Sequence, residues 1–112
     1  MNKPKSKPLL QMKRHTKIYL DACGYDVTDY ITSELTPQKA VDIHHIIGRG
    51  KGGKDRIENL MALSRGEHIE FGDKRDWMYF LLAKHNAFLK FRNIAFDQAW
   101  FDEMYNKYQD TL

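Results

Sequence analysis

Three histidines and an asparagine in the middle of the chain have the types and the spacing that metal-assisted hydrolysis needs. His44 and His45 are adjacent, and Asn59 and His68 follow at intervals that suit a return strand and a short helix. Imidazole binds divalent metals, and it is the side chain best suited to take a proton near neutral pH. A bound metal beside a positioned base is a common arrangement for hydrolysing a phosphodiester. The pattern therefore suggests a hydrolytic metal site.

The segments around these residues predict two strands and a short helix. Residues 40–47 are rich in Val and Ile and are broken by a glycine, which predicts a strand. Four glycines within residues 48–53 predict a loop, because such a run suits neither helix nor strand. Residues 57–64 can return as the second strand, and residues 65–72 are predicted as a short helix that carries His68. The predicted order is strand, loop, strand, helix.

Helices are predicted on both sides of this unit. A short helix over residues 15–23 should end at Gly24. After the unit, Asp73 and Asp97 are suitable N-caps for two helices that occupy much of residues 73–110. Their apolar residues recur at three- and four-residue spacing, as expected of a face buried in a core. They are Trp77, Phe80, Leu81, Phe88 and Phe91 in the first helix, and Trp100, Phe101, Met104, Tyr105 and Tyr108 in the second.

The composition is that of one folded domain with a basic tail. The 112 residues are 42% hydrophobic and 29% charged, which suits a globular chain with a small core. Residues 1–8 alternate Lys and Pro and predict a flexible tail. The expected domain is 9–112, with a ββα core at about 40–72 and a helical part at about 73–110. The predicted class is α+β: a two-stranded antiparallel hairpin plus a short helix, with flanking N-terminal and C-terminal helices.

The charge distribution and the cysteine content indicate which partners and which cellular compartment to expect. The net charge is +3, and basic residues crowd the start of the chain and the glycine-rich stretch, where Arg49, Lys51 and Lys54 lie. Such clusters attract polyanions but also suit a solvated loop; beside a phosphate site, contact with DNA phosphates is the favoured interpretation. Cys23 is the only cysteine, which excludes an internal disulfide. No apolar run suits a membrane span and no signal segment is visible, so a cytoplasmic location is expected.

The order His-His, Asn, His within a strand–loop–strand–helix pattern resembles the HNH motif of the ββα-metal endonucleases. Stand-alone HNH proteins of bacteriophages are similar over more of the chain, including Ile-Glu-Asn-Leu-Met (57–61) and Glu-His-Ile-Glu-Phe-Gly-Asp-Lys (67–74). The resemblance implies a metal-dependent endonuclease that nicks or cuts DNA with low sequence specificity and leaves 5′-phosphate and 3′-hydroxyl ends. It also implies double-stranded DNA and a phage large terminase as partners, in the host cytoplasm.

The resemblance assigns roles to individual residues. His44 and His68 correspond to the metal ligands. His45 corresponds to the general base that deprotonates the attacking water, and Asn59 to the residue that holds the loop and aims His45. Asp42 lies two residues before His44, on the same strand face, and is expected to hold His44 by a hydrogen bond. Two histidines alone bind a metal loosely, so water and phosphate oxygens should complete the shell, which suits Mg²⁺ or Mn²⁺.

The adjacency of His44 and His45 raises a geometric problem. Neighbours on a regular strand point to opposite faces, so both rings cannot face one phosphate from an ideal strand. The resemblance implies that the pair lies where the strand ends and the loop begins, and Gly48 follows shortly after.

The chain departs from many HNH proteins because it lacks the two Cys-x-x-Cys pairs that bind a structural zinc ion. The matching positions hold Ser33, Thr36, Ser64 and Glu67. None of these can supply a thiolate ligand, so no structural zinc is expected. The C-terminal aromatic helices are expected to provide the missing stability.

Several residues also allow other interpretations. An adjacent His pair alone is ordinary, and His15 and His85 have no partners in the sequence and are expected to be surface or helix residues. Residues 48–55 approach a nucleotide-binding P-loop, but Asp55 stands where that motif needs Ser or Thr. A nucleic-acid-binding accessory without turnover and an RNase or DNase toxin are the rivals to the enzyme. The intact His45 argues against the first, and the lack of a translocation or receptor region argues against the second.

Overall fold

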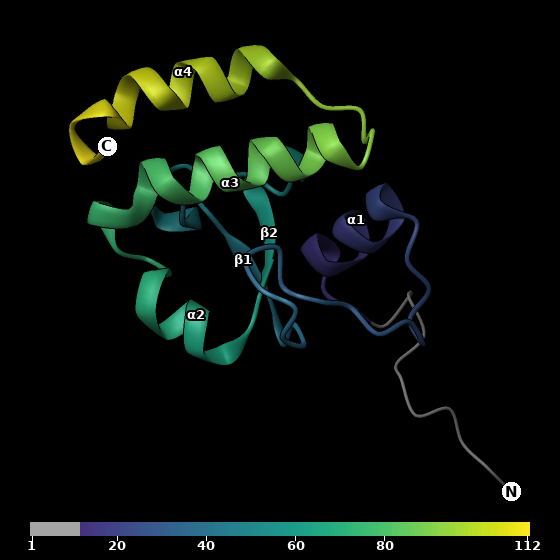
Figure 1. Cartoon of the computed structure of the whole chain (residues 1–112). Coiled ribbons are helices and arrows are strands. Elements are labelled where there is room, and N and C mark those ends of the chain that lie inside the picture. Colours follow the sequence, from purple (N-terminus) through teal and green to yellow (C-terminus); the bar gives the residue numbers. More distant parts are fainter. Residues whose placement is uncertain (1–11) are drawn as a thin grey trace, which may run out of the picture.

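The computed structural model describes residues 12–112, which form an α+β fold around a two-stranded antiparallel hairpin (Figure 1). The strands are β1 (Asp42–His45) and β2 (Leu60–Leu63), and the helices are α1 (Arg14–Cys23), α2 (Arg65–Phe71), α3 (Met78–Phe91) and α4 (Gln98–Tyr108). The order β1, β2, α2, with α1 before it and α3 and α4 after it, confirms the predicted fold class. The basic tail predicted for residues 1–8 lies outside the described residues. No helix within residues 12–112 is long and apolar enough to cross a membrane.

The predicted helix ends are confirmed at two places and wrong at a third. α1 ends at Gly24, whose φ of 74° lies in the left-handed region that glycine adopts without strain. α4 follows Asp97, whose carboxylate accepts a hydrogen bond from the Ala99 amide at 3.0 Å. Asp73 does not cap α3, which begins at Met78. An N-cap needs extended backbone, whereas Asp73 has a φ of 58° and lies in the turn between α2 and α3.

The hairpin is covered on both faces, and its second strand divides the core in two. All four residues of β2 are buried, and neighbouring side chains on a strand point to opposite faces. Met61 and Leu63 belong to a larger apolar cluster with residues of α3 and α4, while Leu60 and Ala62 belong to a smaller one with residues of α1. Figure 1 shows this arrangement, with α1 on one side of the hairpin, α3 on another, and α4 lying along α3.

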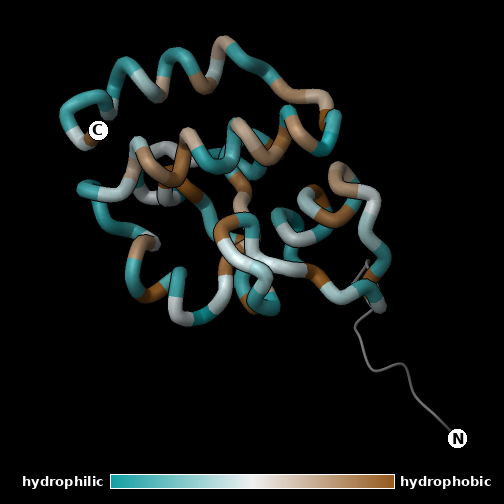
Figure 2. Tube along the Cα trace, in the orientation of Figure 1, coloured by the Kyte–Doolittle hydropathy of each residue, from teal (hydrophilic) through white to brown (hydrophobic). Residues whose placement is uncertain are grey.

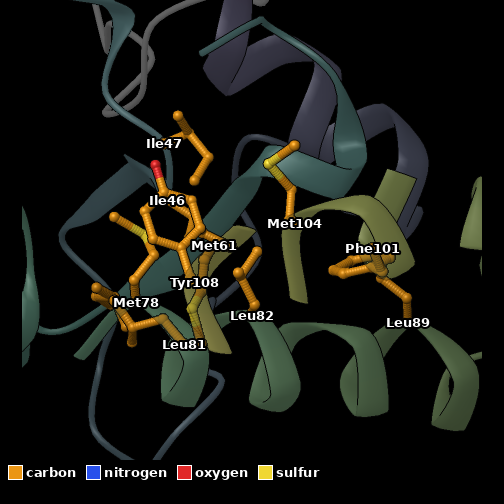
Figure 3. Packing of buried hydrophobic residues seen from close by; sticks show 11 residues of the cluster. Ile46, Ile47, Met61, Met78, Leu81, Leu82, Leu89, Phe101, Met104 and Tyr108 are labelled. Atoms are coloured by element: carbon orange, nitrogen blue, oxygen red, sulfur yellow. The ribbon is translucent and has the colours of Figure 1, made fainter. Parts of the chain in front are cut away.

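The larger cluster joins α3 and α4 to the chain that follows β1 (Figure 3). Ile46 and Ile47 were predicted to continue the strand; they come after its end instead, and both are buried. Hydrophobic and hydrophilic stretches are interspersed along α3 and α4 (Figure 2). The helical part therefore packs directly on the segment that leads out of the candidate site.

The predicted apolar face is confirmed for α4 and partly wrong for α3. In α4, Phe101, Met104 and Tyr108 are buried, and Trp100 and Tyr105 pack against the cluster. In α3, Phe91 is 84% exposed, although the aromatic spacing placed it on the buried face. The residues of α3 that are buried are Met78, Leu81, Leu82, His85, Asn86 and Leu89.

A buried ion pair joins α3 to the segment before β1. The side chains of His85 and Glu34 are fully buried, and His85 Nδ1 lies 2.6 Å from Glu34 Oε1. His85 Nε2 lies 2.6 Å from the Ile57 carbonyl oxygen. With Glu34 ionised, both partner atoms accept, so both ring nitrogens donate and His85 is an imidazolium. Burial alone would lower the pKa of His85, but the Glu34 charge and these hydrogen bonds outweigh burial and raise it.

The same carboxylate ties two further elements to the core. Glu34 Oε2 accepts hydrogen bonds from the Tyr19 hydroxyl of α1 (2.6 Å) and from the Ala62 amide of β2 (3.3 Å). Burial and the Glu34 charge hold the pKa of Tyr19 well above its ordinary value of 10.0, so the hydroxyl remains a donor. α1, β2 and α3 therefore meet at one carboxylate. His85 lies in a helix, as one of the two expectations had it, but the expectation that it lacks partners is wrong, because it pairs with Glu34 inside the core.

The four residues at the positions of the missing cysteine pairs come together in space. Glu67 Oε1 accepts hydrogen bonds from the Ser33 hydroxyl and the Ser64 amide, and Glu67 Oε2 accepts one from the Thr36 hydroxyl. The Ser64 hydroxyl caps α2 by accepting from the Glu67 amide at 3.2 Å. Burial disfavours the charged form, but these donors outweigh it and lower the pKa of Glu67. A charged carboxylate thus braces the start of α2, the helix that carries His68.

The variant His85→Gln tests the buried pair. It leaves the Glu34 carboxylate buried without its cation, so the free energy of unfolding at pH 6 should fall by about 3–5 kcal/mol. The double variant Glu34→Gln/His85→Gln removes both charges and should lose less than the sum of the two single losses. The contribution of the His85 charge is complete below its ordinary pKa of 6.5 and declines as the pH rises through the raised pKa.

Urea unfolding of the four proteins of this cycle measures the coupling. The matched control is Lys17→Gln, which breaks the exposed Lys17–Asp21 pair (2.9 Å) of α1 and should cost no more than about 0.5 kcal/mol. Strictly additive losses for Glu34 and His85 would contradict a coupled buried pair.

Candidate metal centre

Alternation along β1 separates the two adjacent histidines. β1 ends at His45, so the pair does lie where the strand meets the loop. The rings still leave opposite faces of the hairpin, as a regular strand requires. The centre of the His44 ring lies 4.7 Å from that of His68 in α2, and the centre of the His45 ring lies 4.5 Å from that of His15 in α1. Each histidine therefore has its own partners.

One open pocket nevertheless touches both histidines. It has a volume of about 280 Å³, and its lining includes His44, His45, His68, Arg49 and Asp73. The expected geometric conflict is thus resolved at the end of the strand, where both faces of the hairpin border the same opening. A phosphate group in this pocket would be within reach of residues from either face.

Three residues of this pocket could hold a metal ion. His44, His68 and Asp73 each offer one ligand atom, and these atoms all lie within 4.8 Å of one another. His68 Nε2 and Asp73 Oδ2 are 4.0 Å apart. Two imidazole nitrogens and one carboxylate oxygen form a donor set that suits several divalent metals. The structure brings together the two predicted ligands and adds Asp73, which was not predicted as one.

The His44 imidazole is the strongest indication of a bound cation. The residue is 4% exposed, and Nε2 has no hydrogen-bond partner among the described residues. Burial, with the charge of His68 adding to it, lowers the pKa of His44 to about 4, so the ring is neutral near pH 7, as ligation requires. An unsatisfied buried polar atom costs about 1–3 kcal/mol, which coordination would offset. The residues present therefore fit a divalent metal.

Asp42 supports His68 and not His44, which corrects the prediction. Asp42 Oδ2 lies 3.0 Å from His68 Nδ1. Because a carboxylate only accepts, Nδ1 carries the hydrogen and Nε2 keeps its lone pair. A carboxylate behind a ligating imidazole fixes this tautomer and strengthens the ligand. Alternation predicted the face of Asp42 correctly, but α2 packs over that face and brings His68 to the carboxylate.

The turn after α2 sets the positions of His68 and Asp73. A Cβ atom on Gly72 would lie 2.4 Å from His68 Cδ2 and 2.5 Å from the His68 carbonyl oxygen, so only glycine fits beside this ring. Asp73 has a left-handed φ of 58°, which costs a non-glycine residue on the order of 1 kcal/mol. Strain at a residue that presents a ligand atom is a common feature of functional sites.

His45 forms a separate pair with Asp55. His45 Nε2 lies 2.7 Å from Asp55 Oδ1, and the two side chains are 14% and 15% exposed. The hydrogen bond from His45 lowers the pKa of Asp55, so the carboxylate is ionised and can only accept. In the neutral ring Nε2 therefore carries the hydrogen, and Nδ1 holds the lone pair. A histidine with this fixed tautomer is suited to accept a proton at Nδ1.

Asn59 closes the loop that joins the two members of this pair. Asn59 is fully buried; its Oδ1 accepts from the Ile47 amide (2.7 Å), and its Nδ2 donates to the carbonyls of Ile47 (3.0 Å) and Lys54 (3.1 Å). Lys54 directly precedes Asp55, so the hydrogen bond from the Asn59 side chain to the Lys54 carbonyl fixes the backbone at the start of Asp55. A Cβ atom on Gly53 would lie 1.7 Å from the Ile47 carbonyl oxygen, so only glycine permits this closure. Asn59 therefore holds the two ends of this loop together.

Of the three basic residues expected at the DNA backbone, only Arg49 lies at this pocket. Arg49 Nη2 is 3.2 Å from Asp55 Oδ1, and its side chain is 60% exposed. Lys51 and Lys54 line a different pocket of about 260 Å³, together with Trp100 of α4. The basic loop thus divides into one residue at the candidate metal centre and two on the side that faces α4.

Three residues of the site were not identified as such from the sequence. His15 was expected to lack a partner, but its ring lies beside His45, and burial lowers its pKa. Asp55 was noticed only as a mismatch to a P-loop, and Asp73 only as a helix cap. The position of Asp73 shortly after His68 was a local signal for a further ligand. Nothing local could have indicated His15, because α1 is remote in sequence from the hairpin.

Comparisons of the chain with protein-family models, with curated proteins and with solved structures find no match. The resemblance to HNH endonucleases therefore rests on the residue pattern alone.

The variant Asn59→Ala tests the loop closure. It leaves the Ile47 amide and the carbonyls of Ile47 and Lys54 buried without their side-chain partner, so the free energy of unfolding should fall by about 3 kcal/mol or more. Hydrogen exchange at the Ile47 amide should accelerate with it. The matched control is Asn86→Ala in α3, another buried asparagine, whose amide makes a single hydrogen bond, to Tyr105. Equal losses in the two variants, measured by urea unfolding, would contradict a special role for Asn59.

Proposed function

We propose that the protein is a metal-dependent endonuclease of the HNH type that hydrolyses phosphodiester bonds in DNA. The observation that supports this most is the free, buried Nε2 of His44 beside His68 and Asp73, in a pocket that His45 also lines. A cation site and a base held by its own carboxylate at one opening are the two components that metal-assisted phosphodiester hydrolysis needs.

The metal would be held by His44, His68 and the Asp73 carboxylate, with water and phosphate oxygens as the remaining ligands. A divalent ion bound there supplies neutralisation of the negative charge on the scissile phosphate and on the departing oxygen. Mg²⁺ and Mn²⁺ remain the proposed ions, and the second imidazole favours Mn²⁺ because nitrogen ligands bind transition metals better than they bind Mg²⁺.

His45 is proposed to take the proton of the attacking water at Nδ1. Asp55 holds the hydrogen on Nε2, so the lone pair stays on Nδ1 before the transfer, and the carboxylate stabilises the imidazolium after it. Asn59 acts on His45 indirectly, because it fixes the loop that carries Asp55. The direction of the base is in this way determined by the folded loop.

The basic loop is proposed to contact the DNA backbone at the metal centre and at the neighbouring pocket beside α4. Arg49 would meet the phosphate nearest the pocket, and Lys51 and Lys54 would meet phosphates further along the strand. Contacts to phosphates position DNA without reading its sequence, which fits the proposed low specificity. A role in phage DNA processing or packaging, with a large terminase as partner, belongs to the same proposal and derives from the resemblance alone.

A supercoiled-plasmid assay with the two adjacent histidines as a matched pair tests this function. The wild-type protein should nick plasmid with Mg²⁺ or Mn²⁺ and should lose that activity in EDTA. His45→Ala should lower the rate at least about 100-fold while Mn²⁺ binding, measured by calorimetry, is retained. His44→Ala should lose both activity and Mn²⁺ binding, because it removes a ligand.

Two outcomes would contradict the proposal in different ways. Nicking that survives His45→Ala would remove His45 as the base. DNA binding without nicking under either metal would favour a non-catalytic nucleic-acid-binding accessory, which needs neither the free His44 nitrogen nor the His45–Asp55 pair.

A further inference from the structure

A second group of possible metal ligands lies around the proposed base. His15, His45 and Asp55 offer three ligand atoms within 4.8 Å of one another, separate from His44, His68 and Asp73. They come from the first turn of α1, the end of β1 and the loop before β2. The described contacts in this group are the His45–Asp55 hydrogen bond of 2.7 Å and the neighbouring His15 and His45 rings.

The donor set of this group, which is the same as that of His44, His68 and Asp73, suits zinc better than magnesium. Two imidazoles and one carboxylate, with a water molecule, are a frequent tetrahedral shell for Zn²⁺, whereas Mg²⁺ prefers oxygen ligands. In such a shell neighbouring ligand atoms lie about 3.3 Å apart, as bonds of about 2.0–2.1 Å require. His45 Nε2 and Asp55 Oδ1 need only to separate slightly for an ion to replace the hydrogen between them. His15 lies in the first turn of its helix, where a small adjustment is easiest.

Arg49 opposes a cation at this position. Its Nη2 lies 3.2 Å from Asp55 Oδ1 and 3.4 Å from His15 Nδ1, so it occupies ligand atoms and adds a positive charge. The Arg49 side chain is 60% exposed, and it can turn into solvent when an ion arrives. Removing Arg49 should therefore strengthen zinc binding, whereas removing any of the three ligands should weaken it.

Metal at this position would change the tautomer of the base. With a hydrogen on Nε2, held by Asp55, the lone pair of the neutral His45 ring is on Nδ1. With a metal on Nε2, the remaining hydrogen of the neutral ring must be on Nδ1, which then cannot accept a proton. We propose that His15, His45 and Asp55 form a second metal site, which binds Zn²⁺ and whose occupation inhibits the enzyme. The inhibition rests on the nuclease function proposed above, but the binding does not.

Zinc titration of the full chain by calorimetry tests the site without DNA. The wild-type protein should bind two Zn²⁺ ions. His44→Ala should lose one of them, and His15→Ala should weaken the other at least tenfold. Arg49→Gln should tighten that second ion severalfold, a gain that damage to the fold cannot produce. Asp55→Asn provides a second loss variant if His15→Ala does not fold, as judged by circular dichroism.

Binding of only one zinc ion by the wild type, or two zinc ions of unchanged affinity in His15→Ala and Asp55→Asn, would overturn the second site. An activity measurement separates inhibition from binding: with saturating Mg²⁺, added Zn²⁺ should inhibit nicking, and His15→Ala should need at least ten times more zinc for the same inhibition. Equal zinc sensitivity would overturn the inhibitory role. A protein without nuclease activity would refute the proposed function, while the titrations would still decide whether the site exists.

Discussion

The buried amide of Asn59 is the interaction on which the geometry of the site depends. Its hydrogen bonds fix the backbone at Ile47 and at Lys54, near the two ends of the glycine-rich loop. The loop leaves β1 directly after His45 and returns with Asp55, so the amide controls how close these two side chains come. Asn59 is fully buried, and water therefore cannot take over its bonds. The glycine-rich loop is thereby fixed in one conformation, in which Asp55 holds the His45 imidazole.

Alternation along β1 is the second constraint, and it gives the adjacent histidines different environments. His44 faces α2 and is buried without a partner for Nε2, whereas His45 faces α1 and is held by its own carboxylate. Both faces must then be anchored. The Glu34–His85 pair connects α3 to the chain before β1, and Glu67 braces the start of α2. Buried charges with full sets of hydrogen bonds thus hold in place the helices that complete the site.

Features that depend on neighbouring residues could be predicted from the sequence, whereas contacts that depend on the packing of remote segments could not. The helix stop at Gly24 and the strand–loop–strand–helix order depend on neighbouring residues, and both are confirmed. The partner of Asp42 is His68, which depends on how α2 crosses the hairpin and has no local signal. The buried face of α3 was misplaced because apolar spacing selects Phe91, whereas the core accepts the charged His85 through a distant carboxylate. Polar contacts between remote segments were the main source of error.

The proposed function requires a divalent ion between His44, His68 and Asp73, with His45 beside it as a separate base. A crystal structure of the protein with Mn²⁺, located by anomalous scattering, tests this most directly. We expect a peak about 2.0–2.3 Å from Nε2 of His44, Nε2 of His68 and a carboxylate oxygen of Asp73, with the His45–Asp55 hydrogen bond intact. A fully occupied ion elsewhere, with Nε2 of His44 left without a ligand, would contradict it.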